Sequence, residues 1–290
     1  MGIDRSDEPE RGEIARGAAD VVREVDREGD TPSEAHALGE ADDRAEYFES
    51  LRESAWGEAV ERFRARWDAH QERWPEADRE PVDRSADPPG SWRGDSNRYL
   101  DAAANGEVDA RHERIAEVER NVVSPAMREI ESCAPDRTLV GWEHRLKSAD
   151  RFKDKVAGTL EEQPSVAASE AVDEIPDCIR YTFRYESDRY AQGVAADVAR
   201  LADRGFLRGE SRDTWESEQY KGINSRWRTA DGEVRFEVQF HTDVSFAAKQ
   251  LTHETYERLR DPRTTPTEIR ELRNIQREIT RQIPTPPGVG

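Results

Sequence analysis

The apolar positions of the chain follow a helical pattern in its first half. Over 41–74 they recur every three or four residues, as on one face of an amphipathic helix. The stripe consists of Tyr47, Phe48, Leu51, Ala55, Trp56, Ala59, Val60, Phe63 and Trp67. A stripe that carries tryptophans can mark a partner surface, but such stripes are more often core, and we interpret this one as core. A second helix is predicted over 107–132, with Pro125 placed to kink it.

From residue 137 the pattern becomes mixed, because short strand-like runs alternate with helical stretches. Strands are predicted over 179–185, 223–229 and 234–240. The last run alternates strictly, with Val234, Phe236, Val238 and Phe240 on one face and Arg235, Glu237 and Gln239 on the other. Helices are predicted over 148–160, 189–204, 243–260 and 266–282. The alternation predicts an α+β fold, in which a mixed β-sheet is flanked by helices.

Composition divides the chain into three parts. Residues 1–40 are rich in charge and glycine, and we expect them to be disordered or loosely attached. Residues 41–135 form a helical N-terminal region, within which the proline- and glycine-rich stretch 75–98 is predicted to be a linker or long loop. Residues 137–285 form the domain in which we expect the chemistry.

Charge limits the classes of function. Of the 290 residues, 37% are charged and 34% hydrophobic, and the formal net charge is -19. Such an acidic chain repels nucleic-acid phosphate as a whole, so general binding to DNA or RNA is disfavoured. Because lysine is scarce, the acidity suits a halophilic protein in a cytoplasm of high salt.

Cysteine content and hydropathy indicate the compartment. The two cysteines, Cys133 and Cys178, form neither a disulfide framework nor a zinc-site spacing. No apolar run reaches the length of about 18 residues that a membrane span needs. The first ten residues are polar and acidic and lack the apolar core of a signal peptide. We therefore expect a cytoplasmic protein without a membrane partner.

Lysine is concentrated in one region. Among 44 basic residues only five are lysines, and all lie between 147 and 249, namely Lys147, Lys153, Lys155, Lys221 and Lys249. A lysine is a compact point charge that suits phosphate binding. If 148–160 is a helix, Lys147 and Lys155 lie on one face with Arg151, close to Arg145. This row of cations can hold a polyphosphate or can be a solvated helix face.

Acidic and aromatic residues supply the other candidates. Asp177 precedes a predicted strand and can be a magnesium ligand or a simple turn residue. Tyr220, beside Lys221 at a strand entrance, can stack a base or can be an ordinary turn tyrosine. Glu237 and Gln239 share one strand face, which indicates that this face lines a cleft. On its own, His253 in a predicted helix is more often structural than catalytic.

In this order the segments resemble the synthetase domain of the RelA/SpoT family, over about 137–260. The similarity is strongest to the short alarmone synthetases and related toxins. The matching motifs are Arg145-x-Lys147 with Lys155 eight residues later, Asp177 before Ile179-Arg180, Tyr220 with Asn224, Glu237-x-Gln239-x-His241-Thr242, and Phe246-Ala247 before His253-x-x-Tyr256.

The resemblance implies a role for each motif. Arg145, Lys147 and Lys155 would hold the phosphates of ATP, Asp177 and Glu237 would bind Mg²⁺, and Glu237 would also polarise the attacking hydroxyl. Tyr220 would stack the acceptor base. Lys221, Gln239, His241 and His253 are further expected nucleotide contacts.

The sequence also departs from the family pattern. Asp177 lies nearer its arginine than is usual, so Asp173 or Glu174 are alternative ligands. His241 replaces an arginine and Asn224 a histidine. The loop before Tyr220 is acidic where synthetases of guanosine tetraphosphate carry basic residues, which favours the toxin-like branch.

The expected function is therefore a pyrophosphokinase that transfers a diphosphate from ATP to a ribose 3′-hydroxyl. The acceptor would be a guanosine nucleotide, giving ppGpp, or the 3′ end of a tRNA, and the net charge argues against the tRNA. The alternatives are a non-catalytic module that senses nucleotides or binds a protein, and an interaction arm formed by the tryptophan-bearing N-terminal helix.

Overall fold

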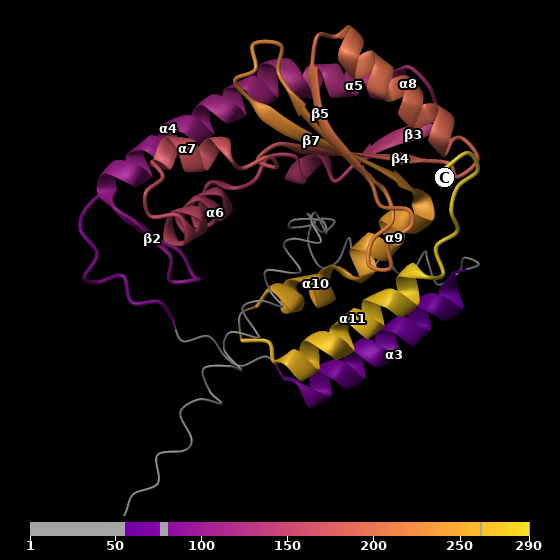
Figure 1. Cartoon of the computed structure of the whole chain (residues 1–290), viewed down its shortest axis with the longest axis horizontal. Helices are drawn as coiled ribbons and strands as arrows, with labels where there is room; N and C mark the ends of the chain where they lie inside the picture. The colour runs from indigo at the N-terminus through magenta and orange to yellow at the C-terminus, as the bar shows by residue number, and fades with distance from the viewer. Residues whose placement is uncertain (1–55, 76–80, 262, 290) are drawn as a thin grey trace, which may run out of the picture. The chain divides into compact units, whose positions relative to one another are not determined.

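The computed structural model describes residues 56–75, 81–261 and 263–289 (Figure 1). The predicted tail 1–40 and the start of the helix predicted over 41–74 lie outside these residues. Contacts divide the described chain into two compact units. The helical unit comprises 56–75, 215–221, 244–261 and 263–284, and the sheet unit comprises 81–214, 222–243 and 285–289. These units divide the chain elsewhere than at the predicted boundary near residue 136.

The helical unit is built from α3 (Gly57–Arg73), α9 (Asp243–Leu251, from its second residue on), α10 (His253–Arg260) and α11 (Pro266–Thr280). Thr265 caps α11 by accepting a hydrogen bond from the Glu268 amide, and Pro266 occupies the first turn. Ala59, Val60 and Phe63 of α3 are buried against Ile275 and Ile279 of α11.

The tryptophan stripe of α3 is part of this core. Trp56 and Trp67 are partly buried and pack against the same cluster. Trp67 also packs against Leu259, Ile269 and Leu272. The interpretation of the stripe as core is therefore confirmed for its described half.

The sheet unit contains a five-stranded sheet in the order β3-β4-β7-β6-β5. Its strands are β3 (Arg137–Val140), β4 (Arg180–Tyr185), β5 (Leu207–Asp213), β6 (Ile223–Arg228) and β7 (Arg235–Thr242). The central pair β4–β7 is parallel and the other pairs are antiparallel. The predicted α+β class and mixed sheet are thus confirmed.

The clear apolar patterns predicted strands and helices that the structure contains, whereas several elements without such a pattern were not predicted. Strands β4, β6 and β7 lie where the alternating runs predicted them, and α6 (Ala149–Glu162), α8 (Tyr190–Asp203) and α11 match three predicted helices. The fourth prediction, 243–260, is split into α9 and α10. Three short elements were not predicted, namely β3, α7 (Ala168–Asp173) and β5. The residues of β5 are almost all exposed and so carry no apolar period.

The helix predicted over 107–132 has three parts. Helix α4 (Ala102–Val118) leads into a π-helical turn, η1 (Glu119–Val123), and then into α5 (Ser124–Ser132). Pro125 has no amide hydrogen to donate, and the widened turn lies directly before it. Within the predicted linker, β1 (Trp92–Arg93) and β2 (Tyr99–Leu100) form a small antiparallel hairpin.

The two faces of the large sheet differ in chemistry. One face carries Tyr181 and Phe183 beside Val238 and Phe240, all buried. Helices α5 and α8 lie along this side in Figure 1, and the Tyr190 hydroxyl of α8 donates to the Phe240 carbonyl at 2.9 Å. This face holds the core, as the alternation in β7 predicted.

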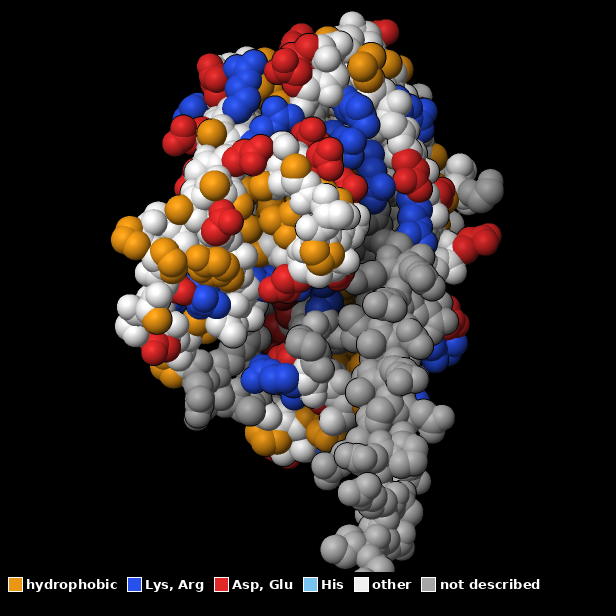
Figure 2. Space-filling model, turned by 60° about the vertical axis from the view of Figure 1, so that its left-hand side comes forward, with side chains coloured by type: hydrophobic (Ala, Val, Ile, Leu, Met, Phe, Trp, Pro, Cys, Tyr) orange, Lys and Arg blue, Asp and Glu red, His pale blue; other side chains and the backbone are white. Residues whose placement is uncertain are grey.

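Acidic and basic side chains are mixed on the part of the surface that can be seen. In Figure 2 they lie side by side among the described residues of one face. Within the part of the chain that the structure describes, no helix combines the length and apolarity needed to cross a bilayer.

Candidate functional site

The other face of the sheet is polar along its centre. The register places Arg180 of β4, Glu237 of β7 and Arg226 of β6 side by side. The next row on the same face is Thr182, Gln239 and Asn224. Because side chains on one face of neighbouring strands contact one another, these rows bring charged groups together within the sheet.

Asp177, just before β4, is the centre of a cluster of cations. Its Oδ1 accepts a hydrogen bond from Lys155 Nζ at 2.8 Å, and its Oδ2 accepts from Arg180 Nη2 at 2.7 Å and from Lys147 Nζ at 3.3 Å. Asp177 exposes 1% of its surface. Burial alone would raise the pKa of this carboxyl, but Lys155, Arg180 and Lys147 outweigh it and hold the pKa well below its usual range.

Backbone pairing explains why these residues meet. The Lys147 amide donates to the Cys178 carbonyl at 2.9 Å, and the Arg180 amide donates to the Arg145 carbonyl at 2.8 Å. Ser148 then caps α6, so that Lys155 lies two turns into the helix. Two members of the predicted cation row, Lys147 and Lys155, both bond to Asp177. Lys147 lies before α6 begins, so the two lysines do not lie on one helix face as predicted.

Glu237 is tied to the same cluster through Arg180. Its Oε1 accepts from Arg180 Nε at 2.9 Å and from Gln239 Nε2 at 2.5 Å. One guanidinium therefore joins the two carboxylates that were predicted to act together. We call Asp177, Glu237, Arg180, Lys147 and Lys155 the charged cluster; its formal charges sum to one excess positive charge, which favours an anionic ligand.

The carboxylates fit a magnesium ion of the kind that phosphates help to hold. Such an ion takes one or two protein carboxylates and completes its shell with water and phosphate oxygens. Asp177 and Glu237 supply two carboxylates on one side of the sheet. Among the described residues no group of three or more acidic, histidine or cysteine side chains is arranged around a metal position, so a cage made of protein ligands alone is not present there.

The alternative acids are less suited to this role. Asp173 ends α7 and is exposed, and its Oδ1 pairs with Arg111 at 2.9 Å. Glu174 is also exposed. Cys178, beside Asp177, is buried, and burial raises the pKa of its thiol to about 12, which makes it a poor nucleophile.

The Arg145 side chain makes its hydrogen bonds to residues outside the charged cluster. Its Nε contacts Glu119 Oε1 at 2.7 Å and Ser124 Oγ at 3.1 Å, and its Nη1 donates to the Trp142 carbonyl at 3.0 Å. Only its backbone carbonyl reaches the cluster, through Arg180. Arg145 was predicted to group with the two lysines. Its backbone lies next to the charged cluster, but its side chain bonds to other residues.

His241 lies on the polar face of β7, where it pairs in register with Arg184 and is fully buried. Gly222 approaches it so closely that a Cβ there would lie 2.9 Å from the imidazole Cε1. Asn224 is also buried on this face. The two positions that depart from the family pattern are thus side chains of the polar face.

Three predicted site residues belong to the helical unit, which is described by itself. Tyr220 is buried, with 5% of its surface exposed. Lys221 donates to the Trp215 carbonyl, and its pKa is lowered by partial burial. His253 is the first residue of α10 and is half-buried. In the acidic loop before Tyr220, Glu218 pairs with Arg277 at 2.9 Å and with Arg281 at 2.7 Å, both of which belong to this unit.

Arg180 and Glu119 were not predicted to be functional residues. For Arg180 the sequence contains a signal, because a charged residue lies inside an apolar strand. For Glu119 it contains no signal, because a glutamate that is buried in the fold has the same place in a helical pattern as a surface glutamate.

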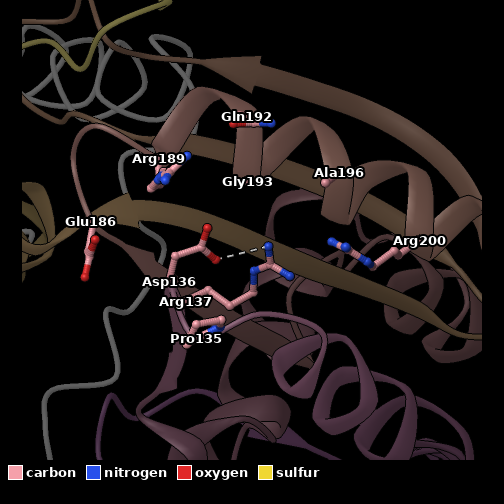
Figure 3. A pocket seen from close by; sticks show the side chains of 9 residues that line it. All are labelled: Pro135, Asp136, Arg137, Glu186, Arg189, Gln192, Gly193, Ala196 and Arg200. Carbon is pink, nitrogen blue, oxygen red and sulfur yellow. Dashed lines mark ion pairs between the residues drawn. The ribbon is translucent and has the colours of Figure 1, made fainter.

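A pocket of about 520 Å³ lies at the opposite end of β4 from Asp177 (Figure 3). Arg137, Arg189 and Arg200 line it together with Asp136 and Glu186. Two of these arginines pair with the buried Asp197, Arg137 at 3.0 Å and Arg200 at 2.6 Å. Positive and negative charges balance here, so this pocket lacks the excess positive charge of the charged cluster.

No protein-family model matches the chain, and no curated protein matches it. Among solved structures it is similar to small alarmone synthetase 1 from Bacillus subtilis bound to its product pppGpp, with 12% identity, 62% of this chain and 93% of the other covered, and a TM-score of 0.39. It is also similar to a GTP pyrophosphokinase family protein from Streptococcus pneumoniae, with 15% identity, coverage of 63% and 90%, and a TM-score of 0.40.

A third similar structure is the complex between the Type VI effector Tas1 and its immunity protein, with 20% identity, coverage of 61% and 96%, and a TM-score of 0.38. All three TM-scores lie below 0.5, so these similarities do not by themselves assign a function to the chain.

Proposed function

We propose that the chain is a RelA/SpoT-like pyrophosphokinase that transfers a diphosphate from ATP to a ribose 3′-hydroxyl. The observation that carries the proposal is the Arg180 bridge between Asp177 and Glu237, with Lys147 and Lys155 on the same aspartate. Two carboxylates, three cations and one excess positive charge are a donor set that suits a polyphosphate and its magnesium ion.

The lysines are the groups that phosphate would engage. Each now pairs with Asp177, and Lys155 keeps 27% of its side chain exposed, so its ammonium group can turn towards an anion at the surface. Asp177 and Glu237 would then hold Mg²⁺, which neutralises charge on the phosphates. Arg180 keeps both carboxylates in place, since it bonds to each of them.

The proposed transfer is a single nucleophilic displacement at phosphorus. The acceptor hydroxyl oxygen attacks the β-phosphorus of ATP, the bond from that phosphorus to the α,β-bridging oxygen breaks, and AMP leaves. Glu237 is the carboxylate proposed to take the hydroxyl proton. Such a transfer depends on in-line placement and charge neutralisation more than on covalent chemistry, in keeping with a site of charged groups and an unreactive Cys178.

The acceptor is proposed to be a guanosine nucleotide or the 3′ end of a tRNA. The excess of Asp and Glu over the whole chain disfavours the larger polyanion. The internal pairing of Glu218 with Arg277 and Arg281 removes part of the negative charge that argued against a phosphorylated nucleotide.

One observation favours a second candidate, a non-catalytic nucleotide-binding or protein-interaction module. Three cations already neutralise Asp177, as they would in an ion cluster with a purely structural role. This candidate predicts binding without turnover.

The deciding experiment is an assay with γ-labelled ATP and Mg²⁺ in high salt, with GDP, GTP or total tRNA as acceptor. The proposal expects AMP release together with label on one acceptor. Binding of ATP by folded protein, without label on any acceptor, would support the binding module instead. The Glu237→Gln variant is the control for contaminating activity, because it removes the proposed base and metal ligand.

A further inference from the structure

Glu119 is a buried carboxylate to which the proposed reaction gives no role. It exposes 2% of its surface and opens the π-helical turn between α4 and α5. The Tyr181 hydroxyl donates to its Oε1 at 2.5 Å, Ser124 Oγ contacts the same oxygen, and Arg145 Nε lies 2.7 Å from it. Single π turns inside helices occur often at functional sites.

Stability alone does not account for this arrangement. A buried ion pair is costly to desolvate, and apolar residues of similar size commonly stabilise a fold as well or better. Glu119 is nevertheless enclosed by polar partners, since Ser124 and Tyr181 also contact each other at 2.8 Å. The burial of Tyr181 and its bond to Glu119 raise the pKa of its phenol, so it remains a donor to the carboxylate at all relevant pH values.

The result is a guanidinium held on several sides. Arg145 is fixed by Glu119 and Ser124 at Nε, by the Trp142 carbonyl at Nη1, and by the Trp142 ring, whose centre lies 4.6 Å from Cζ. Within the described chain, no residue accepts a hydrogen bond from Arg145 Nη2, and 25% of the side chain is exposed. One donor edge of a rigid arginine is thus left for a ligand.

The position of this arginine connects it to the charged cluster. The Arg145 carbonyl accepts from the Arg180 amide, and Lys147 follows two residues later. We propose that Glu119 is a positioning residue that holds the Arg145 guanidinium in the orientation in which it binds the nucleotide. This inference rests on the proposed function, because the nucleotide that Arg145 would bind is the ATP of the proposed reaction.

The first test needs no ligand. In ¹⁵N–¹H spectra of the intact protein, the Nε–Hε signal of Arg145, assigned by its loss in Arg145→Lys, should be protected from solvent exchange. Glu119→Gln should remove that protection. Glu117→Gln should keep it, because Glu117 belongs to the same helix and pairs only with Arg114 at the surface. Protection that is unchanged in Glu119→Gln would overturn the inference.

The second test is a double-mutant cycle on binding of α,β-methylene ATP with Mg²⁺. Glu119→Gln should weaken binding about tenfold, the loss expected for one charge-assisted hydrogen bond. In an Arg145→Ala background the same change should have no further effect, because Glu119 acts through Arg145. Additive losses in the two variants would overturn the inference. Glu119→Asp keeps the carboxylate, so an affinity restored in this variant would support the inference. The thermal midpoint of each variant is the control for the fold, because general damage would lower it.

The two tests separate the inference from the proposed function. If the wild-type protein does not bind the analogue, the proposed function fails. The spectra then still show whether Glu119 fixes the Arg145 side chain, but the proposal that Arg145 binds a nucleotide is wrong. If the wild type binds and Glu119→Gln binds equally well, the inference fails, whereas the nucleotide binding that the proposed function requires stands.

Discussion

Arg180 and Glu237 lie opposite each other on the parallel strands β4 and β7, and Arg180 Nε is 2.9 Å from Glu237 Oε1. The same guanidinium reaches Asp177 through Nη2. Two carboxylates from distant parts of the chain are therefore held at the separation that one arginine spans. Parallel pairing produces this relationship, because it aligns the start of β4 with the start of β7.

Replacing Glu237 by glutamine tests the proposed chemistry most directly. The amide keeps the size of the side chain but cannot take a proton and is a weak magnesium ligand, so transfer should fall by about 100-fold or more. The far-ultraviolet circular dichroism should remain that of the wild type. Labelled diphosphate transfer measures the effect, and full activity in the variant would show that the assignment of Glu237 is wrong.

Lys155 and Lys153 form a matched pair on α6. Lys155 bonds to Asp177 at 2.8 Å, whereas Lys153 pairs with Asp109 at 2.8 Å. Lys155→Ala should weaken the binding of ATP about tenfold, because one phosphate contact is lost. Lys153→Ala should leave affinity within about twofold of the wild type. Isothermal titration of both variants decides the matter, and equal losses would show that α6 acts only through its general charge.

Strong sequence periods predicted the scaffold of the site. The alternation from Val234 to Phe240 gave both the core face and the polar face of β7, and the register confirmed each. Of the residues in the predicted cation row, Lys147 and Lys155 bond to Asp177, and their role as phosphate ligands stays a prediction. The prediction of β7 succeeded because burial of one face imposes a period that the sequence must carry.

Other features depend on tertiary contacts that leave no period. Strand β5 is an exposed edge strand with a polar sequence, so its pairing with β6 could not be predicted. The direction of the Arg145 side chain depends on Glu119, 26 residues earlier. Tyr220 is buried, which a turn motif in the sequence does not predict.

The low pKa of Asp177 predicts how acid affects stability. A carboxyl whose pKa is lower in the folded than in the unfolded chain stabilises the fold fully above the unfolded value of about 4, and this contribution is lost as the pH falls towards the folded pKa. Asp177→Asn should therefore cost about 3 kcal/mol at pH 7, because buried Lys147 and Arg180 and half-buried Lys155 lose their counter-charge.

Urea unfolding of the wild type and of Asp177→Asn between pH 7 and pH 3 provides the measurement. The difference in free energy of unfolding should be constant down to about pH 4 and then shrink. A difference that grows on acidification would mean that burial, and not the cations, dominates this carboxyl.

The net charge of -19 predicts a dependence on salt. Self-repulsion among exposed carboxylates is screened at high ionic strength, so the thermal midpoint should rise as potassium chloride is increased from about 0.1 to 2 M. Calorimetry over this range measures it. An unchanged or falling midpoint would contradict the interpretation of the acidic composition as an adaptation to salt.

The close approach of Gly222 to His241 predicts a site that does not tolerate a larger residue. A Cβ at position 222 would lie 2.9 Å from the His241 ring and 3.0 Å from the Phe240 carbonyl oxygen, and the backbone φ of 156° is one that other residues rarely adopt. Gly222→Ala should therefore cost about 1–3 kcal/mol, because the start of β6 must move away from β7.

Gly106 supplies the opposite case, since a Cβ there meets nothing within 4 Å and the residue lies inside α4. Gly106→Ala should stabilise the protein by about 0.5–1 kcal/mol through helix propensity. Chemical unfolding of both variants gives the comparison. If Gly222→Ala were as stable as the wild type, β6 would have to be free to shift, and the tight packing of His241 on the polar face would not hold in solution.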